Sequence, residues 1–177
     1  MIPFPDKKYQ IIYADPPWKL TSMSSVAWKM DSPLENKYPT MTFDELKGLP
    51  VRELRDENCG LFLWCTHSTL PDALALMKDW GFKYHCVITW DKKSGFSLCG
   101  FHRRTELLLY GYYGRMNIAT KGKYIPTIIT EAKTSHSTKP IIMRRYIESN
   151  TPAPRIELFA RQKTEGWDVW GNEVNND

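Results

Sequence analysis

The sequence lacks the marks of several common protein classes. Its 177 residues contain no apolar run long enough to cross a membrane, and its first ten residues do not pair a basic stretch with an apolar one. None of the four cysteines forms a CxxC pair, and neither a P-loop nor a GxGxxG fingerprint is present. We therefore expect no membrane partner, no secretion leader and a reducing compartment such as the cytoplasm.

The sequence also gives little reason to expect a metal. Two cysteine–histidine pairs, Cys65-x-His67 and Cys99-x-x-His102, are the best candidates. Their spacing does not match a zinc finger, and Cys65 lies in an apolar run where a thiol packs as a small hydrophobic group. We therefore predict that the protein has no metal site.

Composition indicates a folded protein with charges gathered in one segment. Hydrophobic residues make up 42% of the chain and charged residues 25%, and the length predicts a single domain over residues 1–177. The net charge is only +4, but residues 91–125 hold seven Lys or Arg against two acids, whereas residues 31–60 hold seven acids against four bases. This polarity favours a polyanion bound on one face, with a solvated basic loop as the alternative.

Apolar patterns typical of strands alternate with patterns typical of helices. This alternation predicts an α/β fold with a mostly parallel twisted sheet and helices on both faces, and ligands then bind at the carboxyl ends of the strands. Thr42 and Glu45 form a capping box at the start of a short helix, Gly81 ends a helix over 70–80, and Ser137 or Thr138 can cap a helix that has Pro140 near its first turn. Long loops are expected at 19–40 and 91–103, and strands at 9–14, 60–65, 83–90, 105–112, 126–130 and 155–160, with one more in 166–172.

The residues after the first expected strand suggest a chemistry. Asp15 is followed by Pro16, Pro17 and Trp18, and the two prolines fix their own φ angles and hold Asp15 extended. A carboxylate, a proline carbonyl and a flat ring on one stiff loop suit an aromatic amine, whose two hydrogens need two acceptors. Such acceptors would free the nitrogen lone pair for attack on a methyl group. The same four residues in another setting would form a stiff loop around a buried aromatic ring.

The ordered motifs of the chain resemble those of the MT-A70 family of adenine-N6 methyltransferases. YADPPW at 13–18 is followed by YPTMTFDEL at 38–46, GLFLWCT at 60–66, GFHRRTELLLYG at 100–111, HSTKP at 136–140, RIELFAR at 155–161 and GWDVWGNE at 166–173. The resemblance covers residues 9–173 and implies a Rossmann-like methyltransferase fold that uses S-adenosylmethionine as its cofactor. The family's donor site does not use a GxGxxG fingerprint, so its absence here agrees with the resemblance.

The resemblance also implies roles for individual residues. Asp15, Pro16, Pro17 and Trp18 would hold the target amine and enclose its base, and Asp15 would also contact the methyl donor. The substrate side would include the loop residue Tyr38, the acidic Glu106, the loop lysine Lys139 and, from the basic segment, Lys92, Arg103 and Arg104. The donor would be bound by His136, Ser137, Lys139, Phe159, Arg161, Asn172 and Glu173.

The resemblance leaves the exact substrate open. The short chain is more similar to bacterial and phage DNA-modifying members than to the long eukaryotic RNA enzymes, so we expect adenine in DNA, in a bacterial or phage-infected cytoplasm, with RNA as the alternative. A catalytically inactive nucleic-acid-binding subunit is a second alternative, although such relatives lose the aspartate or tryptophan that this chain keeps. A small-molecule or protein N-methyltransferase is a third. A monomer, a homodimer or a complex with a partner subunit all remain open.

Overall fold

Strand β1 (Tyr9–Ala14) forms where the sequence predicts it and is buried along nearly its whole length. In the computed structural model, which describes residues 3–19, 39–98, 100–118, 124–132, 139–172 and 174, this strand is flanked by parallel strands on both sides. A strand buried on both faces needs a continuous apolar run, which YQIIYA supplies. The prolines that follow cannot continue the ladder, so the chain leaves the sheet at Asp15.

The described strands form one seven-stranded sheet in the order β5-β3-β4-β2-β1-β6-β7. Strand pairs β1–β2, β1–β6, β6–β7 and β3–β5 are parallel, and β4 is antiparallel to both of its neighbours. The mostly parallel α/β fold predicted from the sequence is thus confirmed. The bounds of the other strands are β2 (Arg55–Cys65), β3 (Lys83–Leu98), β4 (Phe101–Tyr113), β5 (Ile128–Thr130), β6 (Arg155–Leu158) and β7 (Asp168–Trp170).

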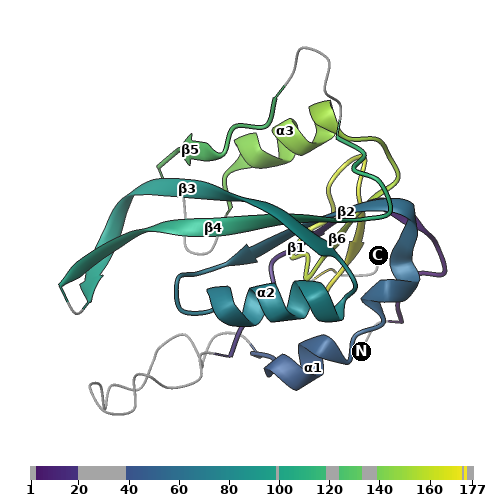
Figure 1. The fold of residues 1–177 in the computed structure, drawn as a ribbon, viewed down its shortest axis with the longest axis horizontal. Coiled ribbons are helices and arrows are strands. Elements are labelled where there is room, and N and C mark those ends of the chain that lie inside the picture. Colours follow the sequence, from purple (N-terminus) through teal and green to yellow (C-terminus); the bar gives the residue numbers. More distant parts are fainter. Residues whose placement is uncertain are drawn as a thin grey trace.

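Helices cover both faces of the sheet, as Figure 1 shows. On one face lie α1 (Phe43–Lys47), which begins at the predicted Thr42–Glu45 capping box, the short 3₁₀ helix at Val51–Leu54 and α2 (Leu70–Asp79). The opposite face carries α3 (Ile141–Asn150). Each face has its own cluster of buried side chains, so the core is divided by the sheet into two layers. No described helix is long and apolar enough to span a membrane.

Two sequence predictions about local structure are wrong. The loop expected at 91–103 is a β-hairpin, because β3 runs on to Leu98 and β4 starts at Phe101. Its Gly, Ser and Lys residues are absorbed by a bulge between Asp91 and Phe96. Helix α3 begins at Ile141 with Pro140 at its N-cap, so neither Ser137 nor Thr138 is the cap. Proline at this position can cap no amide with its side chain, and it fixes the entry of the chain into the helix.

Candidate active site at the carboxyl edge of the sheet

Asp15 stands at the carboxyl end of β1, in the middle of the sheet. Its side chain keeps 28% of its surface exposed, and its Oδ2 lies 2.9 Å from Nζ of Lys139, just before α3. These two residues are 124 positions apart in the sequence (139 − 15). The fold brings them together because the carboxyl ends of parallel strands, and the loops that follow them, share one edge of the sheet.

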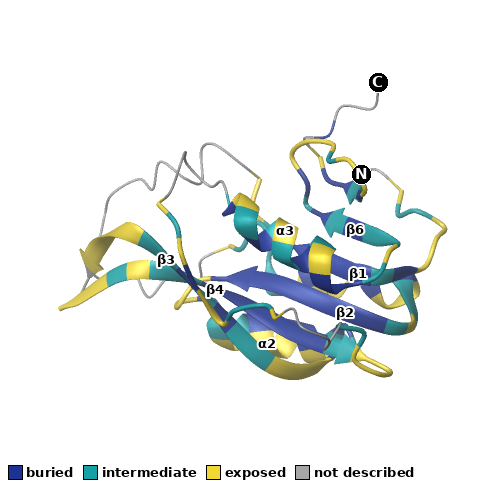
Figure 2. Cartoon of the chain, turned by 90° about the horizontal axis from the view of Figure 1, so that it is seen from above, coloured by how far each residue is buried: buried dark blue, intermediate teal, exposed yellow. Residues whose placement is uncertain are grey.

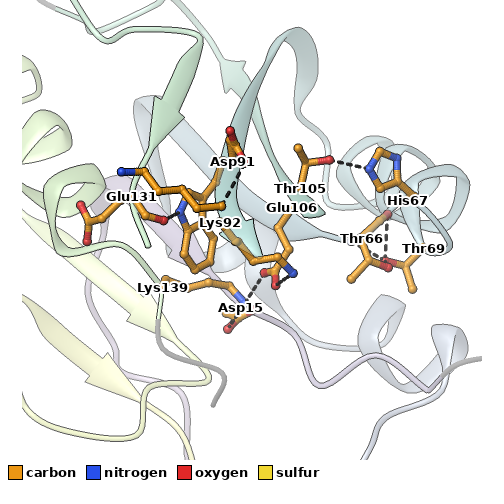
Figure 3. Close-up of polar contacts among 12 residues, drawn as sticks. Asp15, Thr66, His67, Thr69, Asp91, Lys92, Thr105, Glu106, Glu131 and Lys139 are labelled. Atoms are coloured by element: carbon orange, nitrogen blue, oxygen red, sulfur yellow. Dashed lines mark hydrogen bonds and ion pairs between the residues drawn. The ribbon is translucent and has the colours of Figure 1, made fainter. Parts of the chain in front are cut away.

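The Asp15–Lys139 contact is part of a longer row of alternating charges, which we call the ion-pair row. Lys139 Nζ is also 3.1 Å from Glu106 Oε2, and Lys92 Nζ is 3.1 Å from Glu106 Oε1 (Figure 3). The side chains of Lys92, Glu106 and Lys139 are 14–19% exposed, so solvent screens them only partly. The row therefore joins β1, β3, β4 and the start of α3 through two carboxylates and two ammonium groups.

Electrostatics inside the row favours the charged form of its members. Burial acts to raise the pKa of Glu106, but the charges of Lys139 and Lys92 outweigh it and leave this pKa below its ordinary value. Burial acts to lower the pKa of Lys139, and the carboxylates of Asp15 and Glu106 reverse that shift and raise it. Two partly buried cations held by two carboxylates meet the requirement that charge removed from water be paired.

The loop that follows Asp15 is tied down by main-chain hydrogen bonds. The Trp18 amide donates to the Pro16 carbonyl at 2.8 Å, and the Met41 amide donates to the Pro17 carbonyl at 2.8 Å. The Trp18 indole N–H donates to the carbonyl of Trp64 at 3.0 Å. A carbonyl oxygen has two lone pairs, so the Pro16 carbonyl can accept a second hydrogen bond from a ligand. The stiffness predicted from the two prolines thus comes with a fixed position for the tryptophan ring.

Trp64, at the end of β2, is a site residue that the sequence interpretation missed. Its carbonyl holds Trp18, its indole N–H donates to the Tyr13 hydroxyl at 2.7 Å, and Lys139 Nζ lies 5.3 Å from the centre of its ring. A cation above an indole face is attracted by the ring's electron density. Trp64 therefore supports both the aspartate loop and the ion-pair row. The sequence did carry a signal for Trp64, because it is the second-last residue of the buried strand GLFLWC and ligands bind where such strands end.

Three of the residues expected to bind a donor, Phe159, Arg161 and Asn172, lie just after two neighbouring strands. Phe159 directly follows β6 and has a φ of 63°, a left-handed conformation that is uncommon for a bulky residue. Its ring packs against Trp170 of β7, with ring centres 5.5 Å apart. Arg161 and Asn172 follow the same two strands and are exposed. These three residues thus follow the carboxyl ends of β6, the neighbour of β1, and of β7, the next strand in the sheet.

The remaining expected site residues fall into two groups. Arg103 and Arg104 lie on the β3–β4 hairpin, outside the ion-pair row; Arg103 donates to the Ser68 hydroxyl at 3.0 Å and Arg104 pairs with Asp91 at 2.5 Å. The sequence interpretation grouped Lys92 with these two arginines, but the structure places it in the ion-pair row, on Glu106. Four expected residues lie outside the part of the chain that the structure describes: Tyr38, His136, Ser137 and Glu173.

The described residues include no group of three or more His, Cys, Asp and Glu side chains arranged to hold a metal ion. Cys65 is buried in β2, and burial raises the pKa of its thiol to about 12. Its partner in the sequence pattern, His67, instead contacts the Thr105 hydroxyl at 2.7 Å. Cys99 lies outside the described residues.

Comparisons of the sequence with known proteins find related chains. The sequence model of the MT-A70 family matches residues 9–173. The chain is 34% identical to the type II methyltransferase M.MunI from a Mycoplasma species, over 96% of this chain and 79% of that protein. It is 28% identical to the human N(6)-adenosine-methyltransferase catalytic subunit METTL3, over 95% of this chain and 28% of that protein. For the human N(6)-adenine-specific methyltransferase METTL4 the identity is 27%, over 95% of this chain and 38% of that protein. The chain thus spans most of the bacterial relative and less than two fifths of each human one.

Proposed function

Because the chain belongs to the MT-A70 family of methyltransferases, we propose that it transfers a methyl group from S-adenosylmethionine to the N6 amine of adenine in DNA, as a single catalytic domain. The observation that carries this proposal is the position of Asp15 at the carboxyl end of β1, in contact with Lys139 and followed by a proline-stiffened loop. Acceptors fixed in this way are oriented before the substrate arrives, which is what electrostatic catalysis requires.

Asp15 and Pro16 would hold the reacting amine. The amine of adenine has two hydrogens, and its lone pair is spread into the ring. A carboxylate oxygen of Asp15 and the second lone pair of the Pro16 carbonyl would each accept one hydrogen, which favours a pyramidal nitrogen with its lone pair exposed. Asp15 can also take up the proton that the methylated nitrogen releases. A carboxylate accepts up to about four hydrogen bonds, so the contact with Lys139 leaves room for the amine.

Lys139 and Glu106 would set the charge balance around that amine. Lys139 lies between two carboxylates, 2.9 Å from Asp15 and 3.1 Å from Glu106. It neutralises part of the negative charge that would otherwise raise the cost of burying Asp15 beside Glu106. Trp18, fixed by its bond to Trp64, would cover one side of the base.

The strand ends beside Asp15 fit the methyl donor. S-adenosylmethionine supplies an electrophilic methyl group on a sulfonium centre. In this proposal its ammonium would contact Asp15, its ribose hydroxyls Asn172, its adenine ring Phe159 and its carboxylate Arg161; these residues follow strands β1, β7 and β6. Phe159 keeps a left-handed backbone at this edge, and such backbone strain clusters at ligand-binding positions. His136, Ser137, Lys139 and Glu173 are further donor contacts in this proposal.

DNA is the preferred substrate because the chain aligns with most of the length of M.MunI, a type II methyltransferase. Adenine in RNA is the second candidate, since METTL3 is named an N(6)-adenosine-methyltransferase and the alignment spans 95% of this chain. Either way the target adenine has to enter the site from a single strand or be flipped out of a duplex.

The deciding experiment uses the purified full chain. It is incubated with S-adenosylmethionine carrying a labelled methyl group and with DNA or RNA oligonucleotides of mixed sequence, in single-stranded and duplex form. The products are digested to nucleosides and identified by mass. Labelled N6-methyldeoxyadenosine is the expected product; label on N6-methyladenosine alone would favour RNA, and label on neither nucleoside would contradict the proposal.

A further inference from the structure

The β3–β4 hairpin grows directly out of the candidate active site. Lys92 and Glu106, the last members of the ion-pair row, stand at its base. Lys92 begins a bulge of four residues (92–95) opposite Arg104, and pairing then resumes at Phe96↔Arg103. Figures 1 and 2 show the paired strands reaching past the helices, with exposed residues along the outer part of both strands. The hairpin therefore adjoins the candidate site at its base and extends away from it.

One face of the hairpin carries two exposed aromatic rings beside an arginine. Phe96 is 59% exposed and Phe101 is 71% exposed. Phe96 is paired with Arg103, and Arg103 is two positions after Phe101 on the same strand, so the three residues share a face. We call them the hairpin face. Arg103 has five N–H donors, and its bond to the Ser68 hydroxyl uses one of them.

The charge of the hairpin selects among possible partners. Residues 91–106 contain four Lys or Arg against two acids, and since Lys92 pairs with Glu106 and Arg104 with Asp91, the net charge of +2 corresponds to Lys93 and Arg103. A symmetric dimer that joined two hairpins would bring like charges together, which is unfavourable. Exposed rings next to cations instead match a strand of nucleic acid, in which bases stack on aromatic side chains and phosphates contact the cations.

We infer that the hairpin face binds unpaired bases next to the target adenine, on the strand that delivers this adenine to Asp15. The inference rests on the proposed function for the identity of the polymer. Phe101 is five residues from Glu106 along β4, or about 17 Å in an extended strand. Stacked nucleotides rise about 3.4 Å each, so the face lies about five nucleotides from the target.

The test compares long and short single-stranded DNA. Phe96→Ser with Phe101→Ser removes both rings at exposed positions. For an oligonucleotide of about 15 nucleotides, about three times the predicted reach, we expect the Kd to rise roughly tenfold or more, because each stacked ring stabilises binding substantially. For an adenine-containing trinucleotide, which cannot reach the hairpin face, kcat/KM should not change, and kcat should not change for either substrate.

Two matched variants separate stacking from other effects. Phe96→Tyr with Phe101→Tyr keeps both π faces and should retain parental affinity. Tyr84→Ser removes a ring that is 49% exposed at the opposite end of β3, and it should leave the Kd unchanged. Loss of affinity in the serine double variant together with retention in these two controls would support the inference.

Binding is measured by fluorescence anisotropy, independently of methylation, so that two kinds of failure are distinguishable. If binding depends on Phe96 and Phe101 but no nucleic acid is methylated, the proposed function fails and this inference stands. If the serine double variant binds the long oligonucleotide as tightly as the parent, or if the parent binds none, the inference is wrong. A lower sedimentation coefficient for the serine double variant than for the parent, both measured without nucleic acid, would also contradict it. The hairpin face would then join protein chains.

Discussion

The two halves of the candidate site are held in shape by different means. In the half proposed to hold the target amine, which we call the amine half, Asp15, Glu106 and Lys139 come from β1, β4 and the start of α3, and side-chain ion pairs of 2.9–3.1 Å connect them. In the half proposed to bind the methyl donor, which we call the donor half and which lies at the ends of β6 and β7, the described geometry depends on the main chain. Phe159 has a φ of 63°, and the Ala160 amide donates to the Trp170 carbonyl at 3.0 Å.

Close main-chain packing in the donor half leaves no room for a side chain at Gly171. A Cβ at this position would lie 2.2 Å from the Ala160 carbonyl oxygen and 2.7 Å from its nitrogen. Substitutions should therefore act differently in the two halves. Changing a charge should disturb the amine half, whereas adding a single methyl group should disturb the donor half.

The largest effect is expected from Asp15→Ala, which removes the carboxylate of the amine half. The target amine loses an acceptor and Lys139 loses a partner, so we expect the rate of methyl transfer to fall about 1,000-fold or more. Because the donor half is built on other strands, calorimetry should still detect S-adenosylmethionine binding, with weaker affinity. The control is Asp168→Asn. Asp168 is the first residue of β7, two strands from β1, and pairs with Lys7, so this change should leave the rate unchanged. A near-parental rate in Asp15→Ala would refute the proposed mechanism.

The difference between the halves also explains what the sequence could predict. The bounds of β1, the Thr42–Glu45 capping box and helix α2 follow from local patterns, and the structure confirms them. The β3–β4 hairpin could not be foreseen, because Gly, Ser and Lys between 92 and 95 are typical of loops and only pairing with β4 makes them a bulge. Alternating residues such as Phe96-Ser97-Leu98 were the weak signal for a strand.

The ion-pair row was also out of reach of local patterns. Its four charged residues were each candidates by sequence, but which carboxylate meets which lysine depends on the strand order. Lys92 was assigned to the basic segment, whereas the bulge places it on Glu106. Likewise, no sequence pattern predicts the left-handed backbone at Phe159, where a glycine would be the usual residue.

The next largest effect is expected from Lys139→Met, which leaves Asp15 and Glu106 without the cation between them. Methionine approximately preserves the length of the apolar stem over Trp64, so the change isolates the charge. We expect kcat/KM to fall about 100-fold, because unpaired carboxylates close together favour protonation of one of them. Lys92→Met removes the cation at the other end of the row, which contacts Glu106 alone. It should lower kcat/KM by less than about tenfold. Equal losses in the two variants would show that the row acts only through its total charge.

A smaller effect is expected from Gly171→Ala in the donor half. The added Cβ would overlap main-chain atoms of Ala160, so the loop must shift, at a cost of about 2–3 kcal/mol in unfolding free energy. Affinity for S-adenosylmethionine should fall, while Asp15 keeps its ion pair. The matched control is Gly166→Ala, where φ is 78° and no atom lies within 4 Å of the new Cβ. It should cost only about 1 kcal/mol, from backbone strain, and leave donor affinity intact. Chemical denaturation and calorimetry measure both quantities; equal effects of the two variants would contradict the close packing at Gly171.

The smallest effect compares two glutamates whose pKa values shift in opposite directions, Glu106 on β4 and Glu157 on β6, which pairs with Arg144 of α3. Lysine charges overcome burial and lower the pKa of Glu106 below its ordinary 4.5, so its stabilising contribution is complete above pH 4.5 and is lost as the pH falls through the lowered value. Burial outweighs the Arg144 pair and raises the pKa of Glu157, so stability instead decreases as the pH rises from 4.5 to the raised value.

These opposite signs predict opposite changes in the pH dependence of urea unfolding between about pH 3 and pH 7. Glu106→Gln should make the loss of stability on acidification shallower, and Glu157→Gln should make it steeper. Each variant also lowers absolute stability, because Lys139 or Arg144 loses a charged partner, so the slope is the quantity to compare. Slopes that change in the same direction would contradict the opposite pKa shifts of the two glutamates and show that burial and ion pairing act on both alike.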